Sequence, residues 1–473
     1  MSAPSLESNV SAVRLAGRQR REKIMRSALS VAGSVLIALT VTAGCGDGAS
    51  VAAAPGAGAS APPSSSPAGD PPSMTGNPVL AWNVVALRTV APYDPPREAR
   101  ALAIVHVAIA DALSGLHGRW APLVEPSGAA SSAGVIGEGT DAAAVAQAAR
   151  DTLVALYPDK RADLDAAFAR SIGGLPSGAA QETGRSAGRR AADAVLAWRA
   201  HDHAEDQVTV ADDTTPGHWR ATPPALAAAL DPGWGQLTPF VLRRGDRFRP
   251  PAPPSMTSEV YTRDFREIVE IGAASSTVRT PDQTAAAQFW KATATQEWNT
   301  LARGLVTAEH LSVPDTARLF AQLNLGEADA AIAAWDAKFT YRQWRPITGI
   351  REAAADGNAA TTEVADWTPL IPTPPFPDYV CGHSALGGAA EGILGRWFGA
   401  GPRSDLDLTS PAAPGLTRHY ATFAAIGDEV LNARVWGGVH WRSSCEQGRE
   451  LGGQVASFVL AHSLRPVGGS SDA

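Results

Sequence analysis

The sequence predicts an all-α fold, and three observations carry this prediction. Apolar residues recur at a helical period through most of 78–465, while alternating β patterns are scarce. Pro-rich breaks such as 250–254 separate the helical blocks. A chain of 473 residues, 45% hydrophobic and 18% charged, is large and apolar enough to bury a sizeable core. We therefore expect one large helical-bundle domain over 78–465, which could be built as two packed bundles.

The individual helices follow from the same period. Residues 98–116 place Leu102, Val105 and Ile109 near one face, which predicts the first clear helix. Further helices are predicted at 140–157, 178–199, 257–273, 281–294, 315–350, 383–398, 417–434 and 443–463. After residue 45 we expect no segment long and apolar enough to span a bilayer.

The first 45 residues are predicted to be an export signal. A region with six basic residues within 14–26 precedes the uncharged stretch 27–44, which is short for a membrane span. Residues 42–45 (Thr-Ala-Gly-Cys) resemble the lipobox of bacterial lipoproteins, with Thr42 where leucine is usual. We expect lipidation of Cys45 and a place at the cell envelope, with a plain secretory signal as the alternative.

Composition bounds the rest of the chain. Residues 46–77 are mostly Gly, Ala, Ser and Pro, which cannot bury enough surface to fold, so we expect a disordered linker there and a flexible tail at 466–473. The net charge of −7 argues against a nucleic-acid partner, and three cysteines exclude a disulfide-dense scaffold. Membrane contact is expected only through the lipid anchor.

The first of three candidate motifs lies in 335–346. Lys338 and Arg345 are seven residues apart, so on one helix they would share a face. Two neighbouring cations repel unless an anion lies between them. The alternative is a solvated basic face, but the flanking Trp335 and Trp344 look buried, and buried charges need partners.

The second motif, 374–385, is a Pro-rich approach that turns at Gly382 into a helix of small residues. Backbone N–H groups at such a helix start form an anion site, and His383 could exchange a proton beside it. The alternative for His383 alone is a packing role.

The third motif runs from Arg434 to Glu446. Ser443 and Glu446 have the spacing of a capping box, which predicts a helix starting just after His440. His440 would then lie on a loop at the positive end of a helix, six residues after Arg434. This is again a position that suits an anion.

Taken together, K-x6-R-P, then G-H-S, then R-x5-H resembles the signature of the vanadium-dependent haloperoxidases. Their superfamily also contains the type 2 phosphatidic acid phosphatases and bacterial acid phosphatases. Residues 81–88 and 100–106 resemble the opening helices of exported bacterial haloperoxidase-like proteins, so the resemblance covers essentially 78–465. It implies an all-α fold and vanadate as cofactor, with phosphate as a competitor. It also implies oxidation of bromide, and of chloride as a second candidate, by hydrogen peroxide to hypohalous acid, with a small organic acceptor.

The resemblance also implies roles for individual residues. The equatorial oxygens of the oxyanion would be held by Lys338, Arg345, Arg434 and the backbone N–H of Gly382. His440 would be the axial vanadium ligand, or the nucleophile of a phosphatase, and His383 the acid–base residue. Trp335 and Phe376 match positions that line the halide side of the pocket, which favours a peroxidase over a phosphatase.

The sequence departs from the family pattern at two positions. Cys381 stands at a cofactor-binding position where serine is usual, which replaces a hydroxyl donor by a thiol. Ser444 stands four residues after His440, where the family usually has aspartate, so the residue that orients His440 is not identified.

Several alternatives remain open. One is an exported acid phosphatase with a phosphohistidine intermediate, and another is a non-catalytic surface lipoprotein that keeps the fold. Cys381 and Cys445 each lie within five residues of a proposed active-site histidine, so they could form a disulfide or remain two buried free thiols. Residues 201–203 (His-Asp-His) are a weaker candidate metal site, because they sit in a polar loop.

Overall fold

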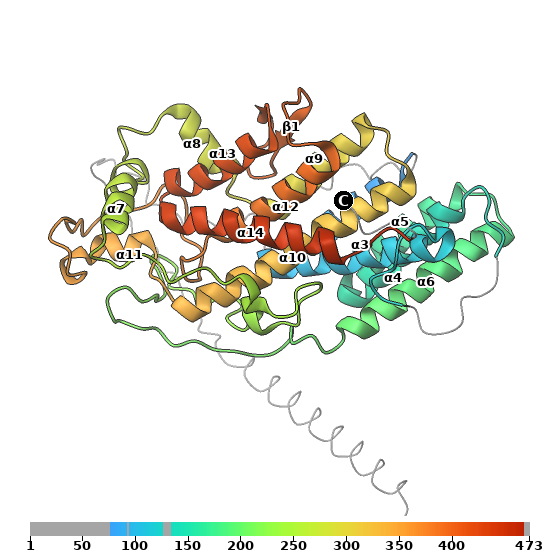
Figure 1. Ribbon diagram of the computed structural model, residues 1–473, viewed down its shortest axis with the longest axis horizontal. Coiled ribbons are helices and arrows are strands. Elements are labelled where there is room, and N and C mark those ends of the chain that lie inside the picture. Colours follow the sequence, from blue (N-terminus) through green and yellow to red (C-terminus); the bar gives the residue numbers. More distant parts are fainter. Residues whose placement is uncertain (1–75, 92–93, 126–133, 468–473) are drawn as a thin grey trace, which may run out of the picture. The chain divides into compact units, whose positions relative to one another are not determined.

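The computed structural model describes residues 76–91, 94–125 and 134–467. Figure 1 shows that helices make up most of this part of the chain. The helices are α2 (Pro78–Val90), α3 (Pro95–His117), α4 (Thr140–Leu156), α5 (Arg161–Gly173), α6 (Ala179–Arg199), α7 (Glu259–Ile271), α8 (Pro281–Phe289), α9 (Ala294–Ala308), α10 (Val313–Tyr341), α11 (Pro346–Arg351), α12 (Gly382–Phe398), α13 (Phe423–Trp436) and α14 (Arg442–His462). The all-α prediction is confirmed.

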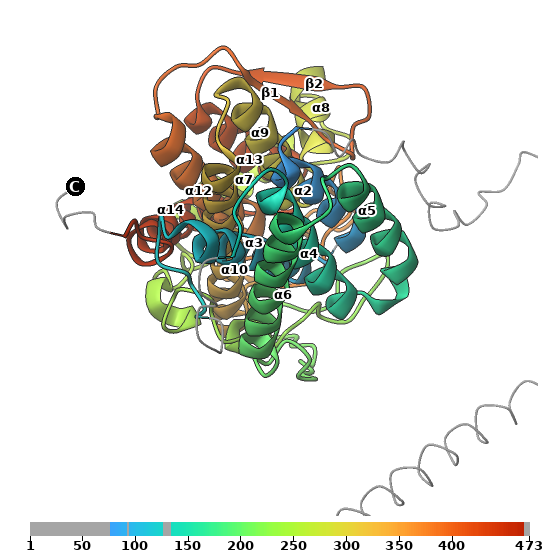
Figure 2. The ribbon, with the colours of Figure 1, turned by 90° about the vertical axis from the view of Figure 1, so that its right-hand side faces the viewer.

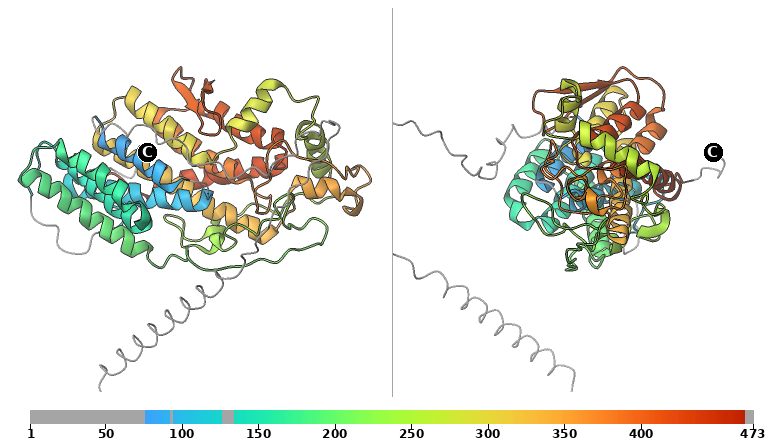
Figure 3. Two further views of the ribbon diagram at one scale, coloured as in Figure 1. Left: turned by 180° about the vertical axis from the view of Figure 1, so that it is seen from behind. Right: turned by 90° about the vertical axis from the view of Figure 1, so that its left-hand side faces the viewer.

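Helix α10 joins two groups of helices. It packs against α3 on one side and against α12 and α14 on the other, and 21 of its 29 residues are buried. Helices α3, α4 and α6 pack on one another, and α13 packs on α12 and α8. Seen from behind in Figure 3, the blue and green helices gather at one end of the domain and the orange and red ones toward the other. A bundle is therefore built on each side of α10.

A single short hairpin interrupts the helices within the described ranges. β1 (Leu406–Thr409) pairs antiparallel with β2 (Thr417–Tyr420), and Figure 2 shows both strands over α8 and α9. The helix predicted from residue 417 is therefore wrong at its start. Helix α13 begins only at Phe423, because the Thr422 hydroxyl caps it by accepting from the N–H of Ala425.

The predicted helix 315–350 is two helices, so Lys338 and Arg345 do not share a helix face. Helix α10 ends where Arg342 adopts a left-handed conformation (φ 51°), and its N–H donates to the carbonyl of Lys338. Arg345 is extended because it precedes Pro346, which begins α11. The chain reverses between the two cations, and the structure still brings both into one site.

The predicted helix 281–294 is also divided. Helix α8 ends at Phe289 and α9 begins at Ala294. In the intervening turn, 290–293, the carbonyl groups of Trp290 and Ala292 face the candidate site. Helix α5 was not predicted, because its sequence is only weakly amphipathic.

Helix α14 starts at Arg442, as expected just after His440, but not through the predicted capping box. No side chain caps it locally among the described residues. Instead, the carboxylate of Asp264 in α7 accepts the N–H of Ser443 at 2.8 Å. Asp264, which is distant in sequence, thus caps the start of α14 in place of the predicted capping box of Ser443 and Glu446.

Helix α3 corrects the expectation about membrane spans. By length and composition it could cross a bilayer, with 23 residues and a mean hydropathy of 1.5 in its most apolar window. However, 83% of that window is buried inside the domain. Helix α3 is apolar because it is the central helix of the N-terminal group.

Several predictions fall outside the described residues: the export signal 1–45 with Cys45, the linker up to residue 75, and the tail from 468. The end of the predicted linker is described, and there the Asn77 side chain caps α2 by accepting from the N–H of Val79.

Candidate active site

Four segments converge on a buried cationic site: the end of α10, the loop 376–381 with the start of α12, the turn 290–293, and the loop between α13 and α14. The predicted cations are all buried, with exposures of 0% for Lys338, 0% for Arg345 and 1% for Arg434. His440 is 1% exposed. The structure thus brings residues from all three sequence motifs together.

The Lys338 ammonium fastens the loop before α12. Its Nζ donates to the carbonyls of Pro377 at 2.9 Å, Asp378 at 3.0 Å and Val380 at 2.6 Å. Burial, followed by the positive charge of Arg345, lowers the pKa of Lys338 to about 7. In this structure Nζ of Lys338 contacts three carbonyls of the loop, whereas the resemblance implied that Lys338 holds the anion.

Arg345 lies directly beside His440. Its Nε donates to the carbonyl of Phe376 at 2.7 Å, and its Nη1 lies 2.7 Å from the carbonyl of Val439 and 2.9 Å from Nε2 of His440. Its Nη2 is buried and meets no hydrogen-bond partner in the described part of the chain. Burial lowers the pKa of Arg345 to about 10, so the guanidinium remains charged at neutral pH.

Arg434 completes the cationic group from the last turn of α13. Its Nη1 donates to the carbonyl of Trp290 at 2.8 Å. Its Nε is buried and has no partner among the described residues. Burial lowers the pKa of Arg434. Arg345 and Arg434 thus each retain a buried N–H group that a further acceptor could satisfy.

Asp378 is a site residue that the sequence reasoning missed. Its Oδ1 lies 3.0 Å from Nδ1 of His440 and 3.7 Å from Nη1 of Arg345, and the residue is 0% exposed. The oxygens of its carboxylate have no well-aligned hydrogen bond within the described residues. It is the one acidic residue in the motif 374–385, which is the signal that could have identified it.

His383, the second residue of α12, faces the turn 290–293. Its Nε2 lies 2.7 Å from the carbonyl of Ala292, and because a carbonyl only accepts, this nitrogen must carry a proton. Burial, followed by the charge of Arg434, lowers the pKa of His383 to about 3. The imidazole is therefore neutral at neutral pH.

Gly382 begins α12, as predicted, and its N–H belongs to the first turn, where intrahelical acceptors are missing. A Cβ atom at this position would meet the Trp335 ring at 3.4 Å, so the backbone lies close to that ring. Cys381 precedes it, fully buried, and its own N–H donates to the carbonyl of Ser444 at 3.0 Å.

Cys381 and Cys445 are neighbours, and the structure holds them as free thiols rather than as the disulfide that the sequence allowed. Burial raises the pKa of Cys445, and Cys381 raises it further. Burial would also raise the pKa of Cys381, but hydrogen bonding with Cys445 and the charge of His440 lower it below its usual range. The thiol at position 381 thus lies close to the candidate anion site.

Trp335 and Phe376 form the aromatic wall that the resemblance implied. Their ring centroids are 4.9 Å apart. Nζ of Lys338 lies 4.9 Å from the Phe376 ring, and the Arg345 guanidinium lies 4.8 Å from the same ring. The two aromatic rings therefore lie against each other, and both cations lie within 5 Å of the Phe376 ring.

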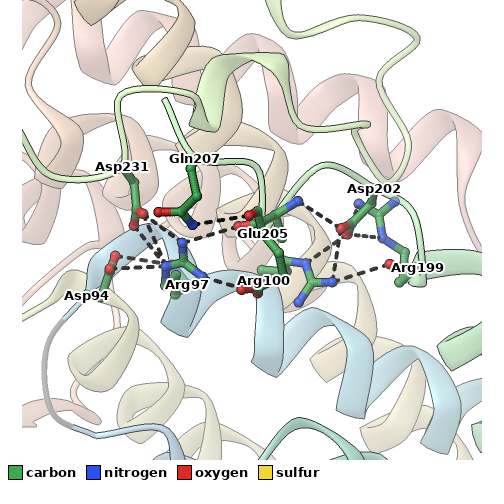
Figure 4. A network of polar contacts seen from close by, with 9 residues as sticks. Asp94, Arg97, Arg100, Arg199, Asp202, Glu205, Gln207 and Asp231 are labelled. Carbon is green, nitrogen blue, oxygen red and sulfur yellow. Dashed lines mark hydrogen bonds and ion pairs between the residues drawn. The ribbon is translucent and has the colours of Figure 1, made fainter. Parts of the chain in front are cut away.

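The weaker metal candidate, 201–203, is occupied by ion pairs. Figure 4 shows Asp202 between Arg100 and Arg199, at 2.8 Å and 2.7 Å. His203 faces Asp206 at 2.9 Å in an exposed position. The described residues contain no group of three His, Cys, Asp or Glu side chains that could hold a metal ion.

Known proteins are similar to this chain over the range of the three motifs. A family model described as the VCPO second helical-bundle domain matches residues 318–469, a range that contains all three motifs. The vanadium chloroperoxidase of Curvularia inaequalis is 24% identical over 284 residues, which are 46% of this chain and 47% of that protein. The chain therefore spans about half the length of the curated relative that it matches.

Solved structures extend the likeness to the N-terminal helices. The first bacterial vanadium-dependent iodoperoxidase has a TM-score of 0.69 and 24% identity, covering 83% of this chain and 97% of that chain. A holo-type bacterial vanadium-dependent chloroperoxidase has a TM-score of 0.62 and 18% identity, covering 80% and 94%. The chain thus has the fold of the bacterial vanadium-dependent haloperoxidases, and the resemblance drawn from the motifs is confirmed.

Proposed function

We propose that this protein is a vanadate-dependent haloperoxidase, which oxidises a halide with hydrogen peroxide. In the balanced reaction, halide, hydrogen peroxide and one proton give hypohalous acid and water. One observation carries the proposal: Arg345 and Arg434, both buried and charged, each have an N–H group unsatisfied by the described residues beside His440. Buried cations of this kind require an anion.

The donors present suit a compact oxyanion. Two guanidinium nitrogens offer charge-assisted hydrogen bonds, and the start of α12 at Gly382 adds backbone N–H groups at a positive helix end. Nε2 of His440 is the nitrogen that would hold vanadium, while Arg345, Arg434 and Gly382 would hold oxygens. Bound vanadate supplies the Lewis-acid centre at which peroxide becomes reactive toward halide.

His383 is the acid–base residue in this proposal. Its proton on Nε2 is donated to Ala292, so Nδ1 carries the lone pair that can accept a proton. The charge of Arg434, which adds to burial in lowering its pKa, is offset once an oxyanion binds between them. The proton affinity of His383 therefore rises when the site is loaded, which suits a group that takes up and delivers the proton of the reaction.

The halide and the small organic acceptor belong on the aromatic side. Trp335 and Phe376 exclude water there, which strengthens the attraction between a halide and the nearby cations. We expect bromide to be oxidised, with chloride as the second halide to test.

An acid phosphatase remains the second candidate, because the same cage would hold phosphate and His440 could act as its nucleophile. With Nδ1 of His440 beside Asp378, Nε2 would be the reacting nitrogen in either chemistry, and the anion would have to take the place of the 2.9 Å contact between Nε2 and Nη1 of Arg345. A non-catalytic surface lipoprotein that keeps the fold is the third candidate.

A side-by-side assay decides among these three. The vanadium-free protein is measured for halogenation of monochlorodimedone with peroxide and bromide or chloride, with and without orthovanadate, and for hydrolysis of p-nitrophenyl phosphate. Vanadate-dependent halogenation supports the proposal, and phosphate release without vanadate supports the phosphatase. Full halogenation without vanadium, or no activity in either assay, contradicts the proposal.

The proposed location is outside the cytoplasm, as a cell-envelope lipoprotein or a secreted protein. The support is the basic region, the uncharged stretch 27–44 and the sequence Thr-Ala-Gly-Cys ending at Cys45. Metabolic labelling with a fatty acid, compared between the wild type and Cys45→Ser, tests the anchor. Equal labelling of both contradicts it.

A further inference from the structure

We propose that Asp378 is the positioning residue for His440, so that in this chain the orienting carboxylate comes from the loop before α12 rather than from position 444. The proposal concerns an acid that the motifs did not assign. This proposal depends on the proposed function only in taking vanadate as the anion that His440 binds.

The distance and burial support this assignment. Oδ1 of Asp378 lies 3.0 Å from Nδ1 of His440, closer than the 3.7 Å that separates it from Arg345. The two residues are 0% and 1% exposed, so water does not compete for the contact. A carboxylate buried this completely needs a charged or hydrogen-bonding neighbour, and the nearest one is the imidazole.

Three hydrogen bonds hold the backbone of Asp378 and so fix the position of its side chain. Its N–H donates to the carbonyl of Gln343 at 2.9 Å. Its carbonyl accepts from Nζ of Lys338 at 3.0 Å and from the hydroxyl of Ser444 at 3.1 Å. Three contacts from three other segments thus fix the position from which the carboxylate reaches His440.

Ser444 has the complementary role. It lies in the first turn of α14, four residues after His440, where an aspartate would be the local means of orienting the ring. Its short side chain instead donates to the main chain of Asp378. In this chain the acid is therefore at position 378, and the residue that supports it by a hydrogen bond is at position 444.

The chemical consequence concerns which nitrogen of His440 carries the proton. A carboxylate beside Nδ1 favours the tautomer with the proton on Nδ1 and leaves the lone pair on Nε2. Nη1 of Arg345 lies 2.9 Å from Nε2 and 3.3 Å from Nδ1 of His440, and because a guanidinium only donates, the shorter contact favours a lone pair on Nε2, near the unsatisfied Nη2 of Arg345. The lone pair is thus presented where the cage would hold its anion.

Asp378 could instead be only a counter-ion for the cations, and the two roles predict opposite results. Removing a mere counter-ion strengthens anion binding, because one negative charge leaves the site. Removing a positioning residue weakens binding, because His440 loses its tautomer and orientation.

The test measures the dissociation constant of orthovanadate by equilibrium dialysis for the wild type, Asp378→Ala, Asp378→Asn and the exchange variant Asp378→Ala/Ser444→Asp. We expect Asp378→Ala to bind about 10- to 100-fold more weakly, as for other residues that orient metal-binding histidines. The Asn variant, which keeps an acceptor but loses the charge, should be intermediate. The exchange variant should return to within about threefold of the wild type, in the same range of effects. Unchanged or tighter binding by Asp378→Ala, or a folded exchange variant that does not recover, overturns the proposal.

A matched control separates positioning from loss of stability. Asp329 is equally buried and accepts three backbone N–H groups, from Phe240, Val241 and Leu242, at 2.7–2.8 Å. Asp329→Asn should lower the melting temperature and leave the dissociation constant of vanadate unchanged. A loss of affinity that merely follows the melting temperature across all variants contradicts a positioning role.

A second measurement needs no vanadate and distinguishes failure of this proposal from failure of the proposed function. In protein with ¹⁵N-labelled histidine, long-range NMR correlations at pH 8.5 report the tautomer of His440, assigned by comparison with His440→Gln. We expect the Nδ1–H form in the wild type and its loss in Asp378→Ala. The Nε2–H form in the wild type overturns the proposal. The Nδ1–H form in a protein that binds no vanadate leaves Asp378 as the positioning residue and rejects only vanadate as the anion.

Discussion

Two regions of this molecule bury charged side chains, and they differ in how burial affects them. The candidate active site gathers the cationic residues Lys338, Arg345 and Arg434. A second cluster, between α3, α9 and α10, gathers the carboxyl groups of Glu98, Glu297 and Glu327, which are 1%, 0% and 0% exposed. We call this the carboxyl cluster.

The carboxyl cluster can lose its charge by taking up protons. Burial raises the pKa of Glu297 to about 8, and it raises the pKa of Glu98 and Glu327 as well. Each group also keeps a neutral partner: Glu297 accepts from Ser410 at 2.6 Å, and Glu98 from Thr293 at 2.6 Å. At pH 7 a protonated Glu297 needs no counter-ion.

The guanidinium groups of the candidate active site cannot lose their charge in this way. Burial lowers the pKa of Arg345 only to about 10, so the guanidinium remains charged at neutral pH. The comparison teaches that equal burial has different consequences: a buried acid can be neutralised by taking up a proton from solution, whereas a buried arginine keeps its charge and requires an anion.

The largest effects are expected from substitution of the two histidines of the candidate active site. His440→Ala should abolish retention of vanadate, because it removes the one protein atom that would bond directly to vanadium. His383→Ala should keep vanadate and lose about 10²–10⁴-fold in turnover, the usual range for an acid–base group. Vanadium content after gel filtration and the halogenation rate measure the two effects. Equal loss of vanadium in both variants contradicts the assigned roles.

The next effect tests whether an unsatisfied buried N–H group makes the anion site. Arg434→Gln should weaken vanadate binding about 10- to 100-fold, which corresponds to one charge-assisted hydrogen bond. Arg199 is the matched control, since it is 2% exposed but paired with Asp202 and with backbone carbonyls. Arg199→Gln should lower the melting temperature and leave the affinity unchanged, and equal losses of affinity would refute the distinction.

A smaller effect should be visible without any mutation. Because the anion binds the folded state, orthovanadate at a hundredfold excess over its Kd should stabilise the protein by about 2.7 kcal/mol. Phosphate should shift the melting temperature in the same direction and compete with vanadate, while chloride at equal ionic strength serves as the control. If neither oxyanion raises the melting temperature, the site does not need an anion.

The smallest effect concerns the carboxyl cluster. Between pH 6 and 7 a folded Glu297 holds its proton, whereas in the unfolded chain, at its ordinary pKa near 4.5, it has lost it. Raising the pH by one unit therefore lowers the free energy of unfolding by up to about 1.4 kcal/mol through this group. Glu297→Gln should remove that part of the slope in urea titrations at pH 6 and 7, whereas Glu309→Gln, an exposed control, should not. An unchanged slope in Glu297→Gln contradicts a protonated cluster.

The sequence predicted the fold class well, because helical periodicity and proline breaks are local signals. It missed the division between α10 and α11, since the helical pattern on either side of Arg342 continues through the break. It also missed the hairpin before α13, in which Leu406 pairs with Tyr420 and Thr409 with Thr417.

The candidate site was predicted from three short motifs, and the structure brings their residues together. The role of Lys338 could not be predicted, because its partners are main-chain carbonyls of a loop whose path no periodicity describes. Asp378 was missed for a related reason: its distance to His440 depends on how α14 packs beside that loop. Tertiary contacts of this kind leave no spacing in the sequence.

The three bonds from Lys338 have an evolutionary consequence. They recognise main-chain oxygens at positions 377, 378 and 380, so the side chains there are not needed to hold the loop in place. A single nucleotide change can therefore alter residue 378 while the loop keeps its path.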